Sequence, residues 1–226
     1  MIVPHHDLAS DLIAEALQKV AQSEQPKRII LIGPNHPDLG SATVLTTKAI
    51  WQMRDIKVFP DELVLNNLVD QHVAEVDDTI LSHEHSIYTI LPFIHTYFPD
   101  AKVVPLILSS KLHITGSFAL AQTLQKYLDD QTLVIASIDF SHYLPSDEDP
   151  IKDAYTKQII LSRDYNDIAS LHNDHMDSPP SLITILKTMD LAGMISTTIL
   201  RNSNSGLIVG RPIYSSTSYF TILFGL

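Results

Sequence analysis

The segment Ile29–Gly40, with the sequence IILIGPNHPDLG, constrains the fold of this chain more than any other. Its apolar, β-branched start is typical of a strand buried on both faces of a parallel sheet, and the Gly-Pro pair after it ends the strand in a sharp turn. Ligands of open α/β sheets bind outside the carboxyl ends of the strands, so Asn35 and His36 are expected to face a ligand. Pro37 fixes the backbone after His36 and stiffens this loop.

Strand and helix patterns alternate along the rest of the chain, which predicts one α/β domain over residues 1–226. No repeat or linker divides it, and the polar, glycine-containing segment 202–210 is expected to be a loop. Strands are predicted at 1–3, 28–32, 42–47, 56–59, 102–108, 132–137, 194–200 and 215–224, and helices at 8–20, 61–70, 86–97, 114–128, 150–162, 165–172 and 181–191.

Charge and composition exclude several classes of partner and site. The formal net charge of -11 argues against binding to nucleic acid or to an anionic membrane, because both would repel the chain. The absence of cysteine excludes disulfides, zinc-thiolate sites and thiol nucleophiles. No apolar run is long enough to span a bilayer and the N-terminus has no signal-peptide pattern, so a cytoplasmic protein is expected.

Four of the 11 histidines follow a predicted strand or begin a predicted helix: His5, His36, His85 and His142. The fold could gather them at one rim of the sheet, and imidazole often serves as a metal ligand or as an acid and base. A shared site is therefore favoured over four independent structural histidines. Five others lie in helical or polar stretches, where a solvated or hydrogen-bonded histidine is the simpler interpretation, and are assigned no function: His72, His95, His113, His172 and His175.

Two carboxylates lie in the same segments, Glu84 and Asp139. Asp139 either caps the turn after its strand or accepts a hydrogen bond that orients a metal-binding histidine, and the sequence leaves both roles open. Histidine and carboxylate without thiolate suit Fe(II), Mn or Zn and disfavour Cu(I).

Several motifs resemble, in the same order, those of the Memo family, which in prokaryotes is also called AmmeMemoRadiSam system protein B. The resemblance runs from Ile2 to the C-terminus. Its motifs are Val3-Pro4-His5, Gly33-Pro34-Asn35-His36, Glu84-His85-Ser86-Ile87 with Leu91-Pro92-Phe93, Ser137-Ile138-Asp139-Phe140-Ser141-His142-Tyr143, Ser203-Asn204-Ser205-Gly206 and Ser215-Ser216-Thr217-Ser218-Tyr219.

The resemblance implies a single three-layer α/β domain with a mostly parallel central sheet flanked by helices, similar to the class III extradiol dioxygenases, which hold non-haem iron. By motif, His5 and His36 match the two histidine metal ligands, and His142 matches the acid and base beside the metal. His85 and Asp139 are assigned with it to the catalytic residues. Two residues are predicted to bind a cofactor. Glu84 matches a family residue that lines the pocket, and Asn35 follows the carboxyl end of a predicted strand.

The chain departs from the family pattern in ways that put this site in doubt. It starts just before the first histidine motif, so one pocket wall is expected to be missing or to come from a partner subunit. Tyr88 stands where a glutamate is common, and some animal members use a cysteine as third metal ligand where this chain has Leu207 and Ile208. The sequence therefore predicts an incomplete site, with water or a buffer anion beside two histidines.

Two classes of function are compatible with these residues. The first is a non-haem metal-dependent oxidoreductase, dioxygenase-like, with Fe(II) as the suspected cofactor and another divalent metal or none as alternatives. The second is a non-catalytic module that binds a small molecule or a peptide and has lost a complete metal site. A zinc hydrolase is a minor third interpretation, and a homo-oligomer is compatible with all three.

Overall fold

A nine-stranded mixed sheet lies at the centre of the part of the chain that this computed structural model describes, residues 1–225. Its middle consists of four neighbouring parallel strands, in the order β1 (Ile2–Val3), β8 (Thr132–Ser137), β2 (Arg28–Pro34) and β7 (Lys102–Leu108). Parallel pairing directs the carboxyl ends of these strands toward the same edge of the sheet, where the segments with the site residues begin.

Shorter or antiparallel strands extend the sheet on both sides. Next to β7 lie β3 (Val44–Thr46), which is antiparallel to it, and β6 (Glu75–Val76). On the other side β11 (Ser216–Gly225) runs antiparallel to β1, to β10 (Ser196–Asn204) and to β9 (His142–Leu144). A separate hairpin is formed by β4 (Trp51–Met53) and β5 (Ile56–Val58).

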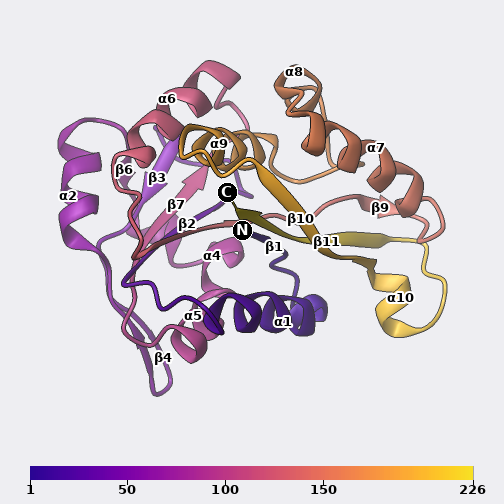
Figure 1. Ribbon diagram of the computed structural model, residues 1–226, viewed down its shortest axis with the longest axis horizontal. Coiled ribbons are helices and arrows are strands. Elements are labelled where there is room, and N and C mark those ends of the chain that lie inside the picture. Colours follow the sequence, from indigo (N-terminus) through magenta and orange to yellow (C-terminus); the bar gives the residue numbers. More distant parts are fainter. Residues whose placement is uncertain (226) are drawn as a thin grey trace.

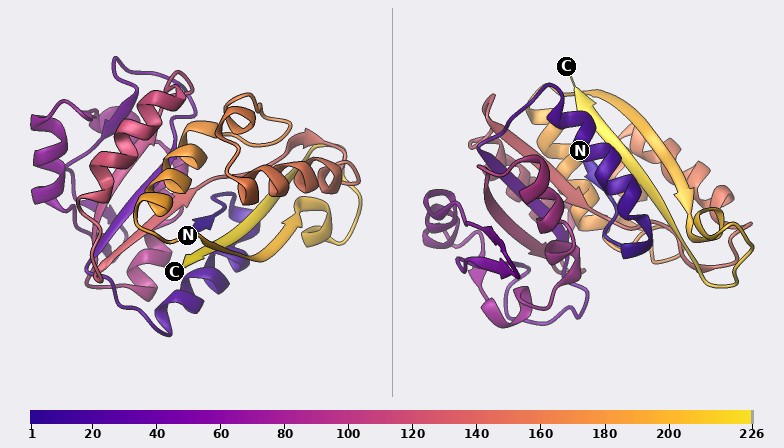
Figure 2. Two further views of the ribbon diagram at one scale, coloured as in Figure 1. Left: turned by 45° about the horizontal axis from the view of Figure 1, so that its top comes forward. Right: turned by 90° about the horizontal axis from the view of Figure 1, so that it is seen from below.

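Helices cover both faces of the sheet and make three layers (Figure 1). One face packs against α1 (Ser10–Ala21), α3 (Asp78–Leu81), α4 (His85–Tyr88) and α5 (Leu91–Tyr97). The other packs against α2 (Glu62–Asp70), α6 (Ile114–Gln125), α7 (Asp149–Ser162), α8 (Tyr165–Ala169) and α9 (Pro179–Leu191). The turned views in Figure 2 show these layers from two further sides, with both termini near the same end of the sheet.

The central strands are buried on both faces because their side chains alternate between the two helix layers. In β2, Ile30 and Ile32 belong to the core cluster under α6 and α9, whereas Ile29 and Leu31 belong to the cluster under α1 and α5. All four are fully buried. This alternation explains why the strand is continuously apolar in sequence, and the predicted three-layer α/β fold with a mostly parallel sheet is confirmed.

The structure corrects several predicted elements. The expected loop at 202–210 is wrong, because β10 continues to Asn204 and the helix α10 (Ser205–Val209) comes next, capped by the Asn204 side chain, which accepts a hydrogen bond from Leu207 N–H at 2.8 Å. The helix predicted at 86–97 is two helices, since α4 ends at Tyr88 and α5 begins at Leu91, with Pro92 in its first turn. The short strands β4, β6 and β9 were not predicted. Among the helices of residues 1–225, none combines the length and apolar character that crossing a bilayer requires.

Candidate metal centre

Three adjacent parallel strands bring the first site residues together. His5 follows β1, Asp139 follows β8 and His36 follows β2, and these strands are neighbours in that order. His5 and His36 come within 5.0 Å of each other, measured between ring centroids, although 31 positions separate them in the sequence. The strand-end placement expected from the sequence therefore produces a shared cluster at one edge of the sheet.

His5 is held rigidly at the bottom of the cluster. Its side chain is 1% exposed, its backbone N–H donates to Asp139 Oδ1 at 3.0 Å, and its Nδ1 lies 3.1 Å from Ser137 Oγ. The Nδ1 contact leaves Nε2 as the ring nitrogen that faces the cluster, 3.7 Å from Asp139 Oδ2. Asp139 thus positions the backbone of His5, whereas Ser137 orients the imidazole.

His36 is oriented by Glu84. Its Nδ1 lies 2.7 Å from Glu84 Oε1, and its backbone N–H donates to Glu84 Oε2 at 2.9 Å. Glu84 also caps α4 by accepting from Ser86 N–H at 3.0 Å, which fixes the carboxylate itself. A histidine whose Nδ1–H donates to a carboxylate presents Nε2 as a lone-pair donor, the usual arrangement at a metal.

His85 adds a third imidazole from the first turn of α4. It stacks on His36 with ring centroids 4.0 Å apart and an interplanar angle of 24°, and its ring centroid is 5.0 Å from that of His5. One nitrogen of each ring can be chosen so that the three lie within 4.8 Å of one another. This arrangement could bind a metal ion, and it places His85, which the family motifs assign to the catalytic residues, beside the two predicted ligands.

Asp177, which the sequence motifs did not indicate, faces the same point. Its Oδ2 lies 3.2 Å from His5 Nε2 and 3.7 Å from His36 Nε2. Its backbone N–H donates to the carbonyl of Asp139 at 3.1 Å, and Asp139 N–H donates back to Oδ2 at 3.2 Å. The only signal in the sequence is the density of polar ligand types in the segment 172–177, HNDHMD.

The carboxylates set the protonation of the cluster. Burial works against the charged form of His5, but Asp139 and Asp177 outweigh it and raise its pKa. Burial acts in the same way on His36, whose hydrogen bonds with Asp177 and Glu84 nevertheless raise its pKa to about 9. Burial lowers the pKa of His85, and the charges of His36 and His5 lower it further. Without a metal, protons on His5 and His36 therefore balance the buried carboxylates.

His142 and Asn35 line a cavity of about 320 Å³ together with His36 and Asp177. Within residues 1–225, His142 Nδ1 is buried without a hydrogen-bond partner, and burial lowers the pKa of this histidine. It lies outside the three-imidazole cluster. The Asn35 side-chain amide donates to Leu39 O at 2.7 Å, so its N–H group holds the loop rather than a ligand.

Comparisons with known proteins agree with this architecture. The family model for Memo-like protein matches residues 1–223. A MEMO1 family protein of Sulfurisphaera tokodaii is 28% identical over 99% of this chain and 82% of its own length. One of Pyrobaculum aerophilum is 30% identical, with 88% of this chain and 73% of its own length covered.

Another relative and a solved structure add detail. A MEMO1 family protein of Saccharolobus solfataricus is 32% identical over 73% of this chain, which spans 60% of that protein. The crystal structure of the uncharacterized protein JW3007 from Escherichia coli K12 superposes with a TM-score of 0.60 and 13% identity over 92% of this chain and 91% of its own, a likeness of fold alone. The sequence motifs, the three-layer sheet and the family match agree: this chain belongs to the Memo family.

Proposed function

We propose that this chain is a metal-dependent oxidoreductase whose Fe(II) ion is held by Nε2 of His5, Nε2 of His36 and Oδ2 of Asp177. The observation that carries the proposal is the buried Asp177 oxygen that faces both Nε2 atoms. Two histidines and one carboxylate on one side of an ion leave its other positions open, the arrangement typical of non-haem Fe(II) oxygenases.

The surrounding residues fit such an ion. Both Nδ1 atoms already contact other groups, Ser137 Oγ and Glu84 Oε1, which leaves the two Nε2 atoms, once they lose their protons, to bind an ion. Asp177 Oδ1 is buried without a hydrogen-bond partner among residues 1–225. The side chains of Asp177, Asp139 and Glu84 are only 8%, 5% and 1% exposed, and a divalent cation would neutralise part of this buried negative charge.

His142 is the residue proposed to move a proton. It lines the same cavity as His36 and Asp177, and its lowered pKa keeps it neutral near pH 7, as a general base requires. Its Nδ1 has no partner within residues 1–225, so it is free to serve a ligand. The ion, when bound, supplies Lewis acidity and redox capacity.

The competing functions make different demands on the same residues. The sequence motifs contain no third ligand, which favours a binding module that has lost its metal. Against this, the Asp177 carboxylate lies next to Nε2 of both His5 and His36, where a third ligand would bind. A zinc hydrolase would use the same ligand set, since two histidines and a carboxylate also bind catalytic zinc. The identity of the native metal separates this class from the oxidoreductase.

We expect protein purified without oxygen to contain about one iron per chain, since the donor set prefers a single divalent ion. His36→Ala should remove the iron, and His142→Ala should retain it, because His142 lies beside the ligands rather than among them. Elemental analysis together with circular dichroism measures both. Folded wild-type protein that stays metal-free after Fe(II) is supplied would overturn the proposal, and stoichiometric zinc would redirect it to hydrolysis.

Metal affinity should fall as the pH drops from about 9, well above the pKa near ~6.5 of an ordinary histidine. The pKa of His36 is raised to about 9 and the pKa of His5 is raised as well, so at lower pH a metal must displace a proton from each of these two ligands. Displacing one proton costs about tenfold in affinity per pH unit. Zinc titrations against a chelator at several pH values would measure this slope. Glu84→Gln should reduce this slope near neutral pH, because it lowers the pKa of His36. A zinc affinity that does not change with pH in the wild type would contradict the assignment of His36 as a ligand.

A further inference from the structure

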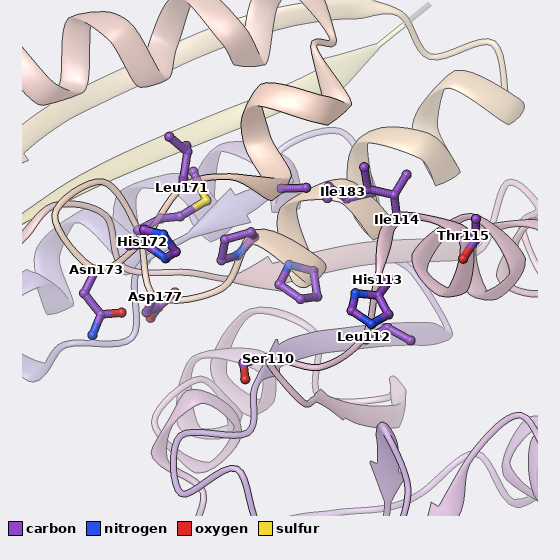
Figure 3. A pocket seen from close by; sticks show the side chains of 14 residues that line it. Ser110, Leu112, His113, Ile114, Thr115, Leu171, His172, Asn173, Asp177 and Ile183 are labelled. Carbon is purple, nitrogen blue, oxygen red and sulfur yellow. The ribbon is translucent and has the colours of Figure 1, made fainter.

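A second, larger cavity adjoins the proposed metal centre. Its volume is about 670 Å³, and it lies between the loop before α6 and the start of α9. Figure 3 shows Asp177, His172 and Asn173 on one side of this cavity and His113, Ile114 and Thr115 on the other. We call it the chamber. Cavities of this size hold molecules the size of cofactors and drugs.

The chamber and the cavity of the metal centre lie side by side and share four lining residues, Ser110, Asn173, Asp177 and Pro180. Asp177 belongs to both places, because its Oδ2 faces His5 and His36 and the residue also forms part of the chamber wall. A molecule in the chamber would thus lie next to the proposed ion.

The chamber floor is apolar and its rim is polar. Leu112, Leu171, Met176 and Ile183 are all at most 9% exposed. The rim is contributed by exposed polar groups at Ser110, His113, Thr115, His172 and Asn173. Contact with such a floor favours an apolar molecule, since burial of apolar surface is the main driving force.

The charges around the chamber oppose an anionic ligand. Within residues 1–225, no lysine or arginine lines either cavity. A divalent ion among Asp177, Asp139 and Glu84 would still leave a negative sum, and the whole chain has a formal net charge of -11. An organic anion in the chamber would lose its hydration without gaining a lysine or arginine partner.

We infer that the chamber binds the body of a neutral, mainly apolar organic molecule and that an uncharged oxygen group at its end reaches the metal centre beside Asp177. The first part of this inference concerns the chamber alone. The second part rests on the proposed function. The inference assigns the substrate class of the site by charge and polarity.

Two probes of nearly equal shape test the charge preference, 2-acetylnaphthalene, which is neutral, and 2-naphthoate, which is anionic. Their dissociation constants are measured by ligand-observed NMR with metal-free and with zinc-loaded protein. We expect the neutral probe to bind at least about tenfold more tightly to the metal-free protein, because the carboxylate must be desolvated there without a lysine or arginine partner. Equal or tighter binding of 2-naphthoate to the metal-free protein would overturn the inference.

A pair of variants on α6 locates the probe. Thr115→Trp places a large side chain in the chamber and should weaken binding of 2-acetylnaphthalene at least about tenfold, whereas Gln122→Trp, exposed on the same helix outside the chamber, should leave it unchanged. Equal effects of the two variants, or none, would overturn the location. Zinc affinity is measured in parallel. Zinc binding without probe binding defeats only this inference, and probe binding without zinc binding defeats only the proposed function.

Discussion

Asp177→Asn is expected to weaken zinc binding at least about 100-fold, beyond the 10–100-fold loss typical of groups that only support a ligand. The carboxylate supplies the only negative charge that lies near the Nε2 atoms of both His5 and His36, at 3.2 and 3.7 Å within residues 1–225. Asparagine keeps the shape and removes the charge. The titration belongs at about pH 9, because loss of Asp177 also lowers the pKa of His36 and would otherwise relieve proton competition.

Asp174→Asn is the matched control. Asp174 lies three residues earlier in the same segment, and its carboxylate pairs with Lys152 and lies 3.9 Å from His175 Nε2, away from the His5, His36 and His85 cluster. Its replacement should leave zinc affinity within about twofold of the wild type, as expected for a half-exposed ion pair. An Asp177→Asn protein that binds zinc as tightly as Asp174→Asn would remove Asp177 from the ligand set and leave the three imidazoles to account for any metal.

The strand-end residues could be placed from the sequence because the signal is local. A buried apolar run that ends at a turn predicts a parallel strand, and parallel strands bring the residues after their carboxyl ends to one edge of the sheet. His5, His36 and Asp139 lie after β1, β2 and β8 for that reason. Their meeting point depends on the order of strands in the sheet, which the sequence pattern did not give.

Asp177 could not be placed in this way because its position depends on contacts between distant segments. The loop before α9 reaches the cluster through a bridge between Met176 and Phe140, next to the mutual hydrogen bonds of Asp177 and Asp139. These contacts join segments 38 positions apart. Local periodicity carries no information about such a contact, so Asp177 comes from a segment to which the sequence pattern assigns no function.

The segment 202–210 was misjudged for a related reason. Its polar residues suggested a loop, but Asn202 donates to the buried Asp153 carboxylate at 2.6 Å, and Asn204 caps α10. Each polar side chain is therefore satisfied inside regular structure. A polar segment is a loop only where its polar groups are hydrogen-bonded to water. The local sequence pattern does not show that Asn202 has a partner on α7.

Gly33→Ala is expected to lower the free energy of unfolding by about 1–3 kcal/mol, the usual cost of overpacking a tight core. A Cβ at this position would lie 2.5 Å from Ser86 Oγ and 2.8 Å from Ser86 Cβ, too close for either atom. Ser86 cannot easily turn away, because it is fully buried in α4 and its hydroxyl donates to Pro34 O at 3.0 Å. Urea denaturation measures the change, and Gly225→Ala, whose Cβ would meet nothing within 4 Å, is the control.

A double-mutant cycle with Ser86→Gly decides whether this contact is the cause. Ser86→Gly removes both clashing atoms, so Gly33→Ala should cost at least about 1 kcal/mol less in that background than in the wild type. Equal costs in the two backgrounds would show that the strain lies elsewhere.

The contact between Gly33 and Ser86 also affects the metal centre. The helix α4 has Glu84 as its N-cap and His85 in its first turn, and Glu84 Oε1 lies 2.7 Å from Nδ1 of His36. Gly33→Ala should therefore also weaken zinc binding, and the double variant should recover part of that loss. The glycine near the end of β2 lets α4 approach this strand closely enough for the histidines to meet.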